Sequence, residues 1–198
     1  MVLGAPAMLF DLDGTLVDSV YQHVAAWHEA LQGAGLDLSV WKIHRKIGMS
    51  GGLFVRGLVR ELGQAVDPEL IRALQRRHAE AYAERFEEVV PLPGARELLG
   101  ALTELGVPWA IATSGGRDVA DRTLGLLDLP PDAAIVTRDE VAHAKPDPDL
   151  FVRAAEKLDV PIASSVVIGD SVWDLLAARR AGALGVGLLS GGYGGEEL

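Results

Sequence analysis

Short apolar runs alternate with longer amphipathic segments along most of this 198-residue chain. The runs are three or four residues long and mostly end in polar residues, as the fully buried strands of a parallel sheet do. The segments between them carry apolar residues three and four positions apart, which is typical of helices that pack one face on a core. The predicted strands cover residues 7–10, 109–112, 134–136, 165–168 and, more weakly, 185–188.

The helices predicted in the second half of the chain have recognisable start and stop residues. Pro93 and Gly94 introduce one helix, and Gly182 closes another. Strands that alternate with helices form parallel β-α-β units. We therefore expect an α/β fold with a Rossmann-like core of three layers around a parallel sheet. Its helices are expected over residues 93–105, 118–127, 148–158 and 175–181.

The stretch after the first strand does not follow this alternation. Apolar spacing there fits helices over residues 19–32, 53–62 and 69–86, and no convincing strand appears between residues 19 and 89. We therefore predict a small helical cap domain, residues 18–89, inserted into a catalytic core of residues 1–17 and 90–198. The glycine-rich end of the chain, from Gly191 to Leu198, is predicted to be loose.

Composition limits the possible functions. The chain has no cysteine, which excludes disulfides, thiolate metal sites and cysteine nucleophiles. Its net charge of -10 disfavours nucleic acids and membranes as partners, so a phosphate anion would need local positive charge. No segment has the length of a membrane span, and Met1–Phe10 lacks the basic start of a signal peptide. We therefore expect a cytoplasmic protein.

Three predicted strands end in polar residues that can take part in catalysis: Asp11, Thr113 and Asp170. In open parallel sheets, ligands bind just beyond the carboxyl ends of the strands. Each residue alone can also be explained as a turn or helix-capping residue. Three such strand ends at the same edge of one sheet favour an active site.

Asp11 and Asp13 form a pair of close carboxylates, and Gly14 allows the sharp turn that follows them. Two such carboxylates repel each other unless a proton or a cation lies between them. Mg²⁺ is suited to this role because it prefers hard oxygen ligands. The alternative is an Asx-turn in which Thr15 caps a helix.

Two further segments carry candidate charges. Lys145 is followed by Pro146 and Pro148, which stiffen its loop and hold its ammonium group in place. A fixed ammonium can neutralise a phosphate or a crowded carboxylate, although a lysine in a loop is usually just solvated. Asp174 lies one helical turn after Asp170 and on the same face, so the two acids suit one metal ion, directly or through water.

Together these motifs resemble those of the haloacid dehalogenase-like hydrolase superfamily. The helical insertion after the first motif resembles the small cap of the branch that contains phosphoglycolate phosphatase, sugar-phosphate phosphatases and β-phosphoglucomutase. The matching segments, in chain order, are Asp11-Leu12-Asp13-Gly14-Thr15, Ile111-Ala112-Thr113-Ser114, Lys145-Pro146 and Gly169-Asp170-Ser171 with Asp174.

The resemblance implies a Mg²⁺-dependent phosphatase. Asp11 would be the nucleophile that forms an aspartyl-phosphate, and Asp13 would be the general acid and base. The phosphoryl oxygens would be bound by Thr113, Ser114 and Lys145. Mg²⁺ would be held by Asp11, the backbone carbonyl of Asp13 and Asp170, with Asp174 orienting these ligands or their waters.

The cap is expected to contact the leaving group of the substrate. The resemblance to β-phosphoglucomutase-like relatives implies that His23 and Arg45 contact the substrate, the arginine at a hydroxyl or a second phosphate. The alternatives are a hinge position for His23 and a solvated surface position for Arg45. Arg76, Arg77 and His78 are expected to form a solvated charged face.

We expect the substrate to be a small phosphorylated metabolite such as a sugar phosphate. A β-phosphoglucomutase-like phosphomutase and a non-catalytic binding domain on the same fold stay open as alternatives. Asp13 argues against a dehalogenase, because carbon–halogen cleavage needs no proton for a leaving alkoxide. Gly169 before Asp170, where β-phosphoglucomutase typically has glutamate, favours hydrolysis. The chain ends soon after the last predicted strand, and an exposed sheet edge could favour association, so we expect a monomer or weak homodimer.

Overall fold

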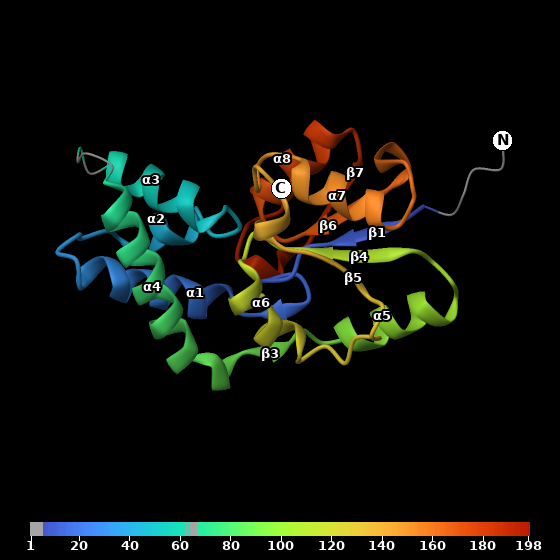
Figure 1. Cartoon of the computed structure of the whole chain (residues 1–198), viewed down its shortest axis with the longest axis horizontal. Coiled ribbons are helices and arrows are strands. Elements are labelled where there is room, and N and C mark those ends of the chain that lie inside the picture. Colours follow the sequence, from blue (N-terminus) through green and yellow to red (C-terminus); the bar gives the residue numbers. More distant parts are fainter. Residues whose placement is uncertain (1–5, 62, 64–66) are drawn as a thin grey trace.

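The computed structural model describes residues 6–61, 63 and 67–198, in which a parallel sheet stands beside a group of helices (Figure 1). The sheet has five strands in the order β5-β4-β1-β6-β7, and every neighbouring pair is parallel. The predicted α/β fold around a parallel sheet is therefore confirmed. The strands are β1 (Met8–Phe10), β4 (Trp109–Ala112), β5 (Ala134–Val136), β6 (Val166–Gly169) and β7 (Leu184–Gly187).

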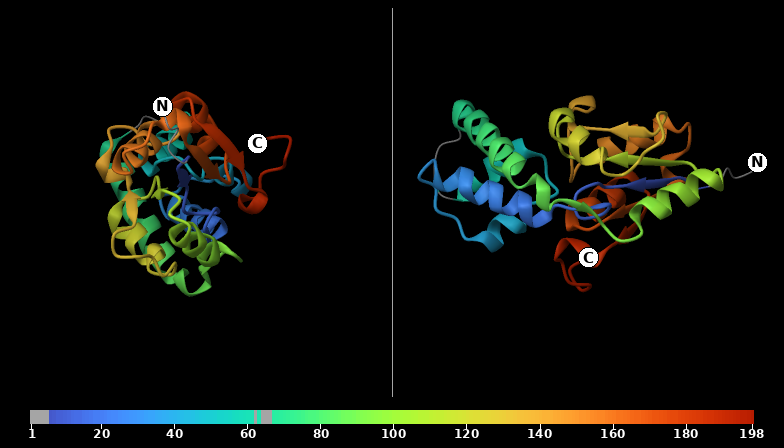
Figure 2. Two further views of the ribbon diagram at one scale, coloured as in Figure 1. Left: turned by 90° about the vertical axis from the view of Figure 1, so that its right-hand side faces the viewer. Right: turned by 90° about the horizontal axis from the view of Figure 1, so that it is seen from below.

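Helices cover both faces of the sheet and complete the three layers (Figures 1 and 2). Successive residues of a strand point to opposite faces, so Leu9 and Phe10 belong to different hydrophobic clusters. The cluster around Leu9 includes buried residues of α7 and α8, and the cluster around Phe10 includes buried residues of α5 and α6. These helices are α5 (Ala95–Glu104), α6 (Arg117–Leu124), α7 (Asp149–Lys157) and α8 (Val172–Ala181).

One helix starts earlier than predicted, for a clear reason. α8 begins at Val172 rather than at Leu175. Oδ2 of Asp174 accepts hydrogen bonds from the Ser171 hydroxyl, at 2.5 Å, and from the Ser171 N–H group, at 3.1 Å. This capping box starts the helix before its apolar pattern begins.

The segment between β1 and α5 is helical, and no strand occurs among its described residues between positions 19 and 89, as predicted. Buried side chains such as Leu31, Phe54 and Leu74 give it a hydrophobic cluster of its own. Its helices are α1 (Val20–Gln32), α2 (Val40–His44), α3 (Gly51–Glu61) and α4 (Pro68–Glu84).

Three details of this helical segment differ from the prediction. The helix expected over residues 53–62 starts at Gly51, and Leu62 lies outside the described residues. α2 was not predicted, because five residues are too few to produce a recognisable helical pattern. α4 ends at Glu84, and its predicted last turn is part of a separate 3₁₀ helix. The 3₁₀ helices are η1 (Phe86–Glu88), η2 (Arg138–Glu140), η3 (Ile162–Ser164) and η4 (Leu189–Gly191).

The chain passes between the sheet and the helical segment at two adjacent points. β2 (Val17–Asp18) leads into α1, and β3 (Val90–Pro91) leads back from η1. The two form an antiparallel ribbon in which Val17 is paired with Pro91. Figure 2 shows how narrow this connection is compared with the parts that it joins. Pairs of two-residue strands carry too little pattern to be predicted.

The glycine-rich end of the chain is not loose, which corrects the prediction. Gly191 and Tyr193 are buried, Tyr193 being 6% exposed. The carbonyl of Gly191 lies 2.7 Å from Nε2 of His44, and the Tyr193 hydroxyl donates a hydrogen bond of 3.1 Å to the Arg45 carbonyl. The end of the chain therefore packs against α2 of the helical segment.

The sequence predicts neither a signal peptide in Met1–Phe10 nor a segment that spans a membrane. Residues 1–5 of the apolar Met1–Phe10 segment lie outside the described residues, and β1 begins at Met8. Among the helices of the described part of the chain, none is long and apolar enough to span a membrane.

Candidate active site

The carboxyl ends of β1, β4 and β6 meet at the edge of the sheet that faces the helical segment (Figure 1). Phe10 is paired with both Ile111 and Ile168, so the residues that follow these three lie close together. The Asp11 N–H group continues the ladder with a 2.9 Å hydrogen bond to the Ile168 carbonyl. The structure thus brings Asp11, Thr113 and Asp170 to one edge, as the sequence predicts.

Three carboxylates gather at this edge: those of Asp11, Asp170 and Asp174. Each offers an oxygen within 4.8 Å of the others, and their exposed fractions are 4%, 3% and 0%. Thr15 donates a hydrogen bond of 3.1 Å to Oδ1 of Asp170. A buried set of hard oxygen atoms this compact is the kind of donor set that Mg²⁺ binds.

Glycines make room for the Asp170 carboxylate on two sides. A Cβ atom on Gly14 would lie 2.4 Å from Oδ2 of Asp170, and a Cβ atom on Gly191 would lie 1.7 Å from the same oxygen. Gly14 also has a φ of +87°, a conformation that other residues rarely adopt. The Asp170 carboxylate is therefore enclosed by the first motif and by the end of the chain.

Lys145 is fully buried in this cluster. Its ammonium group binds Oδ1 of Asp11 and lies 2.8 Å from Oδ1 of Asp174. Ser171 holds the other oxygen of Asp174 at the start of α8. Asp174 is thus placed to position the lysine, in addition to contributing a carboxylate to the cluster.

The pKa values of these groups follow from burial and crowding. Burial, together with the nearby Asp174 charge, raises the pKa of Asp11 to about 7, against the lowering effect of Lys145. Burial, Asp174 and Asp11 raise the pKa of Asp170 well above its usual range. Burial would lower the pKa of Lys145, but Asp11 and Asp174 outweigh it and raise that pKa. One ammonium does not balance three buried carboxylates, so the residues fit an additional divalent cation.

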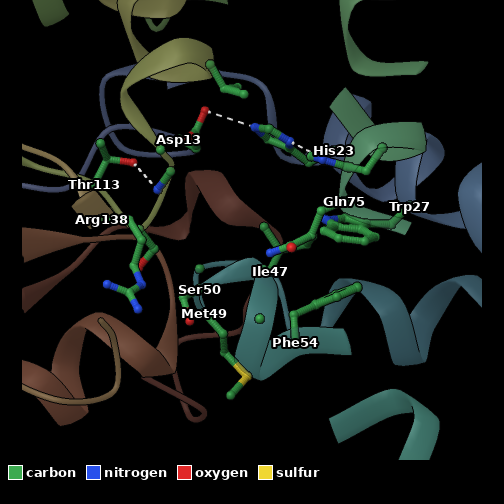
Figure 3. Close-up of a pocket in the computed structure, with 18 of the residues that line it drawn as sticks. Asp13, His23, Trp27, Ile47, Met49, Ser50, Phe54, Gln75, Thr113 and Arg138 are labelled. Carbon is green, nitrogen blue, oxygen red and sulfur yellow. Dashed lines mark hydrogen bonds and ion pairs between the residues drawn. The ribbon is translucent and has the colours of Figure 1, made fainter. Parts of the chain in front are cut away.

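Asp13 points away from this cluster. Its Oδ1 accepts a 2.6 Å hydrogen bond from the Ser19 hydroxyl and lies 3.3 Å from Nε2 of His23 (Figure 3). Burial alone would raise the pKa of Asp13, but His23 and the Ser19 hydrogen bond lower it overall. The carboxyl group of Asp13 also lines the cavity described below, where it can reach a bound ligand.

Thr113 and Ser114 form part of the cavity wall at the end of β4. The Gly115 N–H group donates a 3.0 Å hydrogen bond to the Thr113 hydroxyl (Figure 3). The Ser114 hydroxyl is buried and has no hydrogen-bond partner among the described residues. A buried hydroxyl without a partner is available to a ligand.

A cavity of about 640 Å³ lies between this edge of the sheet and the helical segment. Asp11, Asp13 and the loop after β4 line one side, and residues of α1, α3, α4 and the α2–α3 loop line the other. Figure 3 shows Thr113 and Arg138 on one side of the pocket and Trp27, Gln75 and Phe54 on the other. Sequence reasoning did not identify several of the lining residues, among them Lys46, Arg56, Gln75 and Arg138.

His78 belongs to this wall and not to a solvated face, which corrects the prediction. Its Nε2 lies 3.0 Å from Nδ1 of His23, and its ring stacks on Trp27 with the ring centres 4.1 Å apart. Burial and the neighbouring His23 lower the pKa of His78 well below its usual value. The buried residues Leu74 and Tyr82, four positions before and after, were a signal that this face of α4 is packed.

The predicted cap contacts divide into one residue at the site and one away from it. His23 lies at the site, beside Asp13. Arg45 does not line the cavity: its guanidinium pairs with Glu197 at 2.8 Å and lies 4.7 Å from the centre of the Tyr193 ring. These contacts with the end of the chain hold the Arg45 guanidinium at the surface of the molecule, outside the cavity.

The chain is similar to known hydrolases over most of its length. A family model described as haloacid dehalogenase-like hydrolase matches residues 5–182. Validoxylamine A 7'-phosphate phosphatase of Streptomyces hygroscopicus subsp. limoneus is 34% identical, over 91% of this chain and 84% of the relative. Hexitol phosphatase A of Escherichia coli K12 is also 34% identical, over 88% and 78%. The crystal structure of a hydrolase from Pseudomonas syringae has a TM-score of 0.94 and 53% identity, and the match covers 97% of this chain and 88% of that one.

Proposed function

This chain belongs to the haloacid dehalogenase-like hydrolases, and on that premise we propose that it is a Mg²⁺-dependent phosphatase for a small phosphorylated metabolite such as a sugar phosphate. The observation that carries the proposal is the buried group of Asp11, Asp170, Asp174 and Lys145 at one end of the cavity. Relatives named for a validoxylamine phosphate and for hexitols support a polyhydroxylated substrate.

We assign the helical segment, residues 18–89, as a cap on a catalytic core of residues 1–17 and 90–198. Its separate hydrophobic cluster and the narrow ribbon of β2 and β3 support this division. Closure of such a cap would exclude bulk water from the site during the reaction.

In the proposed reaction, a carboxylate oxygen of Asp11 attacks the phosphorus atom of the ester. The bond between phosphorus and the leaving oxygen breaks, and Asp13 donates a proton to that oxygen. A water molecule then attacks the phosphorus of the aspartyl-phosphate and gives a proton to Asp13, while the bond between phosphorus and the Asp11 oxygen breaks. Inorganic phosphate leaves, and both carboxyl groups return to their starting state.

The other residues would position the phosphoryl group and neutralise its charge, which is most of what phosphoryl transfer requires. Thr113, Ser114 and Lys145 would bind its oxygens, and Asp174 would hold Lys145 in place. The proposed ligands of Mg²⁺ are Asp11, the Asp13 carbonyl and Asp170. When bound, Mg²⁺ would neutralise negative charge on the carboxylates and on the phosphoryl group.

A phosphate-release assay tests this proposal. The purified protein is incubated with Mg²⁺ and a panel of sugar phosphates, polyol phosphates, nucleotides and phosphoglycolate. We expect sustained release over many turnovers from at least one ester, and a loss of about 10³-fold or more when EDTA removes the metal. Absence of turnover across the panel would contradict a phosphatase. Strict dependence on a bisphosphate activator would indicate a phosphomutase instead.

A further inference from the structure

The cavity carries positive charge that the proposed chemistry does not use. Besides the catalytic groups, its lining includes the side chains of Lys46, Arg56 and Arg138. Lys46 is largely neutralised, because it pairs with Glu61 at 2.6 Å. No ion pair joins Arg56 or Arg138 to a carboxylate among residues 6–61, 63 and 67–198. Two guanidinium groups therefore face the cavity with donors to spare.

The guanidinium of Arg56 lies near the N-terminal end of α3, where a cation is not expected. Its terminal nitrogen would come within 3.3 Å of a Cβ atom on Gly52, so the guanidinium folds back over the first turn of α3. That turn contains no acidic residue. The N-terminal end of a helix repels a cation and attracts an anion, so a ligand anion would interact favourably with both the arginine and the helix.

Ser50, which precedes α3, supports the same conclusion. It lines the cavity and is 4% exposed. Within the described part of the chain, no hydrogen bond joins its hydroxyl to another residue. A hydroxyl that lines the cavity and is not used by the protein itself is a donor for a ligand. The glycines that follow, Gly51 and Gly52, have no side chains to shield the N–H groups of the first turn.

Arg138 contributes from the opposite wall. Its N–H group donates a 3.0 Å hydrogen bond to the Gly115 carbonyl, which fixes it beside the loop of Thr113 and Ser114. One nitrogen of its guanidinium donates a hydrogen bond to the Val141 carbonyl at 2.7 Å. Its other side-chain N–H groups donate no hydrogen bond to a described residue. The core and the helical segment thus each supply one arginine to the cavity.

The acidic residues of the cavity lie on its sheet side. Asp11 and Asp13 belong to the proposed chemistry, and Asp139 accepts a hydrogen bond of 2.7 Å from the Arg117 N–H group. Among the described lining residues of the helical segment, none is acidic. In a chain with a net charge of -10, this concentration of basic groups is a specific feature of the cavity.

We propose that the cavity binds a second anionic group of the substrate. The leaving group would carry a carboxylate or a second phosphate, held by Arg56 and Arg138 together with Ser50 and the start of α3. This inference rests on the proposed phosphatase function and narrows its substrate class to phosphate esters with a second negative charge. A cavity of about 640 Å³ has room for a six-carbon compound of this kind.

Matched pairs of esters test the proposal. Sorbitol 6-phosphate and 6-phosphogluconate differ by a carboxylate at the far end, and fructose 6-phosphate and fructose 1,6-bisphosphate differ by a phosphate. At constant ionic strength, we expect kcat/KM to be at least about tenfold higher for the anionic member of one pair, because each such contact is a charge-assisted hydrogen bond. The pair that responds identifies the anion as a carboxylate or a phosphate.

Substitutions locate the effect. Arg56→Gln and Arg138→Gln should each lower the ratio of kcat/KM, anionic over neutral ester, by about tenfold, mainly through a higher KM. Arg60→Gln removes a charge from the same helix at an exposed position outside the cavity, and it should leave the ratio unchanged. Equal losses in all three variants would show a general effect of charge and would overturn the proposal.

Binding to an Asp11→Asn protein separates this inference from the phosphatase proposal. Calorimetry with both members of each pair gives Kd values without turnover. Tighter binding of the anionic member, lost in Arg56→Gln, supports the second-anion site even if turnover is never observed. Equal Kd values within both pairs would refute it. Efficient hydrolysis of neutral esters at the same rate as anionic ones would also refute it, while leaving the phosphatase proposal intact.

Discussion

The charges on the two sides of the cavity differ in burial and in how they are held. On the sheet side, Lys145 and Asp174 are fully buried and pair with each other, and Asp11 is nearly so. On the helical side, Arg56 is exposed, and Lys46 pairs with a carboxylate at the surface of the segment. Interactions between charges are much stronger in a buried, water-poor site than at an exposed one.

This difference indicates that the two sides of the cavity have different roles. The buried side fits a reaction that develops charge in one place and needs fixed groups around it. The exposed side fits selection among substrates, where each contact changes affinity modestly and a different residue gives a different preference. Substitutions of the buried charges at the sheet edge should therefore have large effects on turnover or stability, and those of the arginines that line the cavity should have smaller effects on substrate choice.

Replacing the proposed nucleophile should have the largest effect. Asp11→Asn keeps the size of the side chain but removes its charge, so we expect kcat to fall by about 10⁴-fold or more. Phosphate release measures this loss, and circular dichroism checks that the fold is retained. A folded variant with near-normal turnover would show that Asp11 is not the nucleophile.

Removing the buried ammonium should affect both activity and stability. Lys145→Met leaves the carboxylates of Asp11 and Asp174 without this partner, which should lower the free energy of unfolding by about 3–5 kcal/mol. Urea denaturation without Mg²⁺ measures the change. The control is Lys157→Met, which breaks a partly exposed pair with Glu140 and should cost about 1 kcal/mol or less. Equal losses would contradict the contrast between buried and exposed charges.

Crowding Asp170 should weaken the metal site. Gly191→Ala places a methyl group 1.7 Å from the present position of Oδ2, so the carboxylate or the end of the chain must move. We expect Mg²⁺ affinity to fall by about 10–100-fold, measured by calorimetry and by the Mg²⁺ dependence of turnover. Gly195→Ala is the control, because its Cβ atom would meet nothing within 4 Å. Unchanged Mg²⁺ affinity in Gly191→Ala would argue against Asp170 as a ligand.

The smallest effect is expected at Arg45. This residue pairs with Glu197 at the surface and does not line the cavity, so Arg45→Ala should change kcat/KM by less than about threefold and stability by about 1 kcal/mol or less. A double-mutant cycle with Glu197→Ala should recover the small pair energy. A tenfold rise in KM would mean that Arg45 turns to the substrate when the cap closes, as the family resemblance implies.

Much of the sheet side could be predicted because its candidate catalytic residues directly follow the strands in the sequence. Each short apolar run is followed directly by its polar residue, as in Phe10-Asp11 and Gly169-Asp170. In a parallel sheet the carboxyl ends of strands share one edge, so the positions of these residues in space follow from the pattern. Ser114 lines the cavity at this edge, and Lys145 binds Asp11 there. Their roles in phosphate binding stay predictions.

The helical side could not be predicted in the same way. Whether Gln75 or Arg76 faces the cavity depends on how α4 is rotated against α1, and Arg56 reaches the cavity through the direction of α3. The end of the chain was predicted to be loose, yet Tyr193 is buried against α2 and Glu197 binds Arg45. No local pattern contains these contacts, because they join residues that are far apart in the sequence.

The sequence by itself therefore determined the fold class, the five strands of the sheet with the helices between them, and the group of acids and lysine at the sheet edge. Tertiary structure alone decided which side chains of the helical segment face that group, and where Arg45 and the glycine-rich end are placed. The physical reason is the range of the interactions. Strand ends are defined by neighbours along the chain, whereas the opposite wall of the cavity is defined by the packing of distant helices. On the sheet side, the room around Asp170 is left by Gly14 and Gly191, which lie far from each other in the sequence.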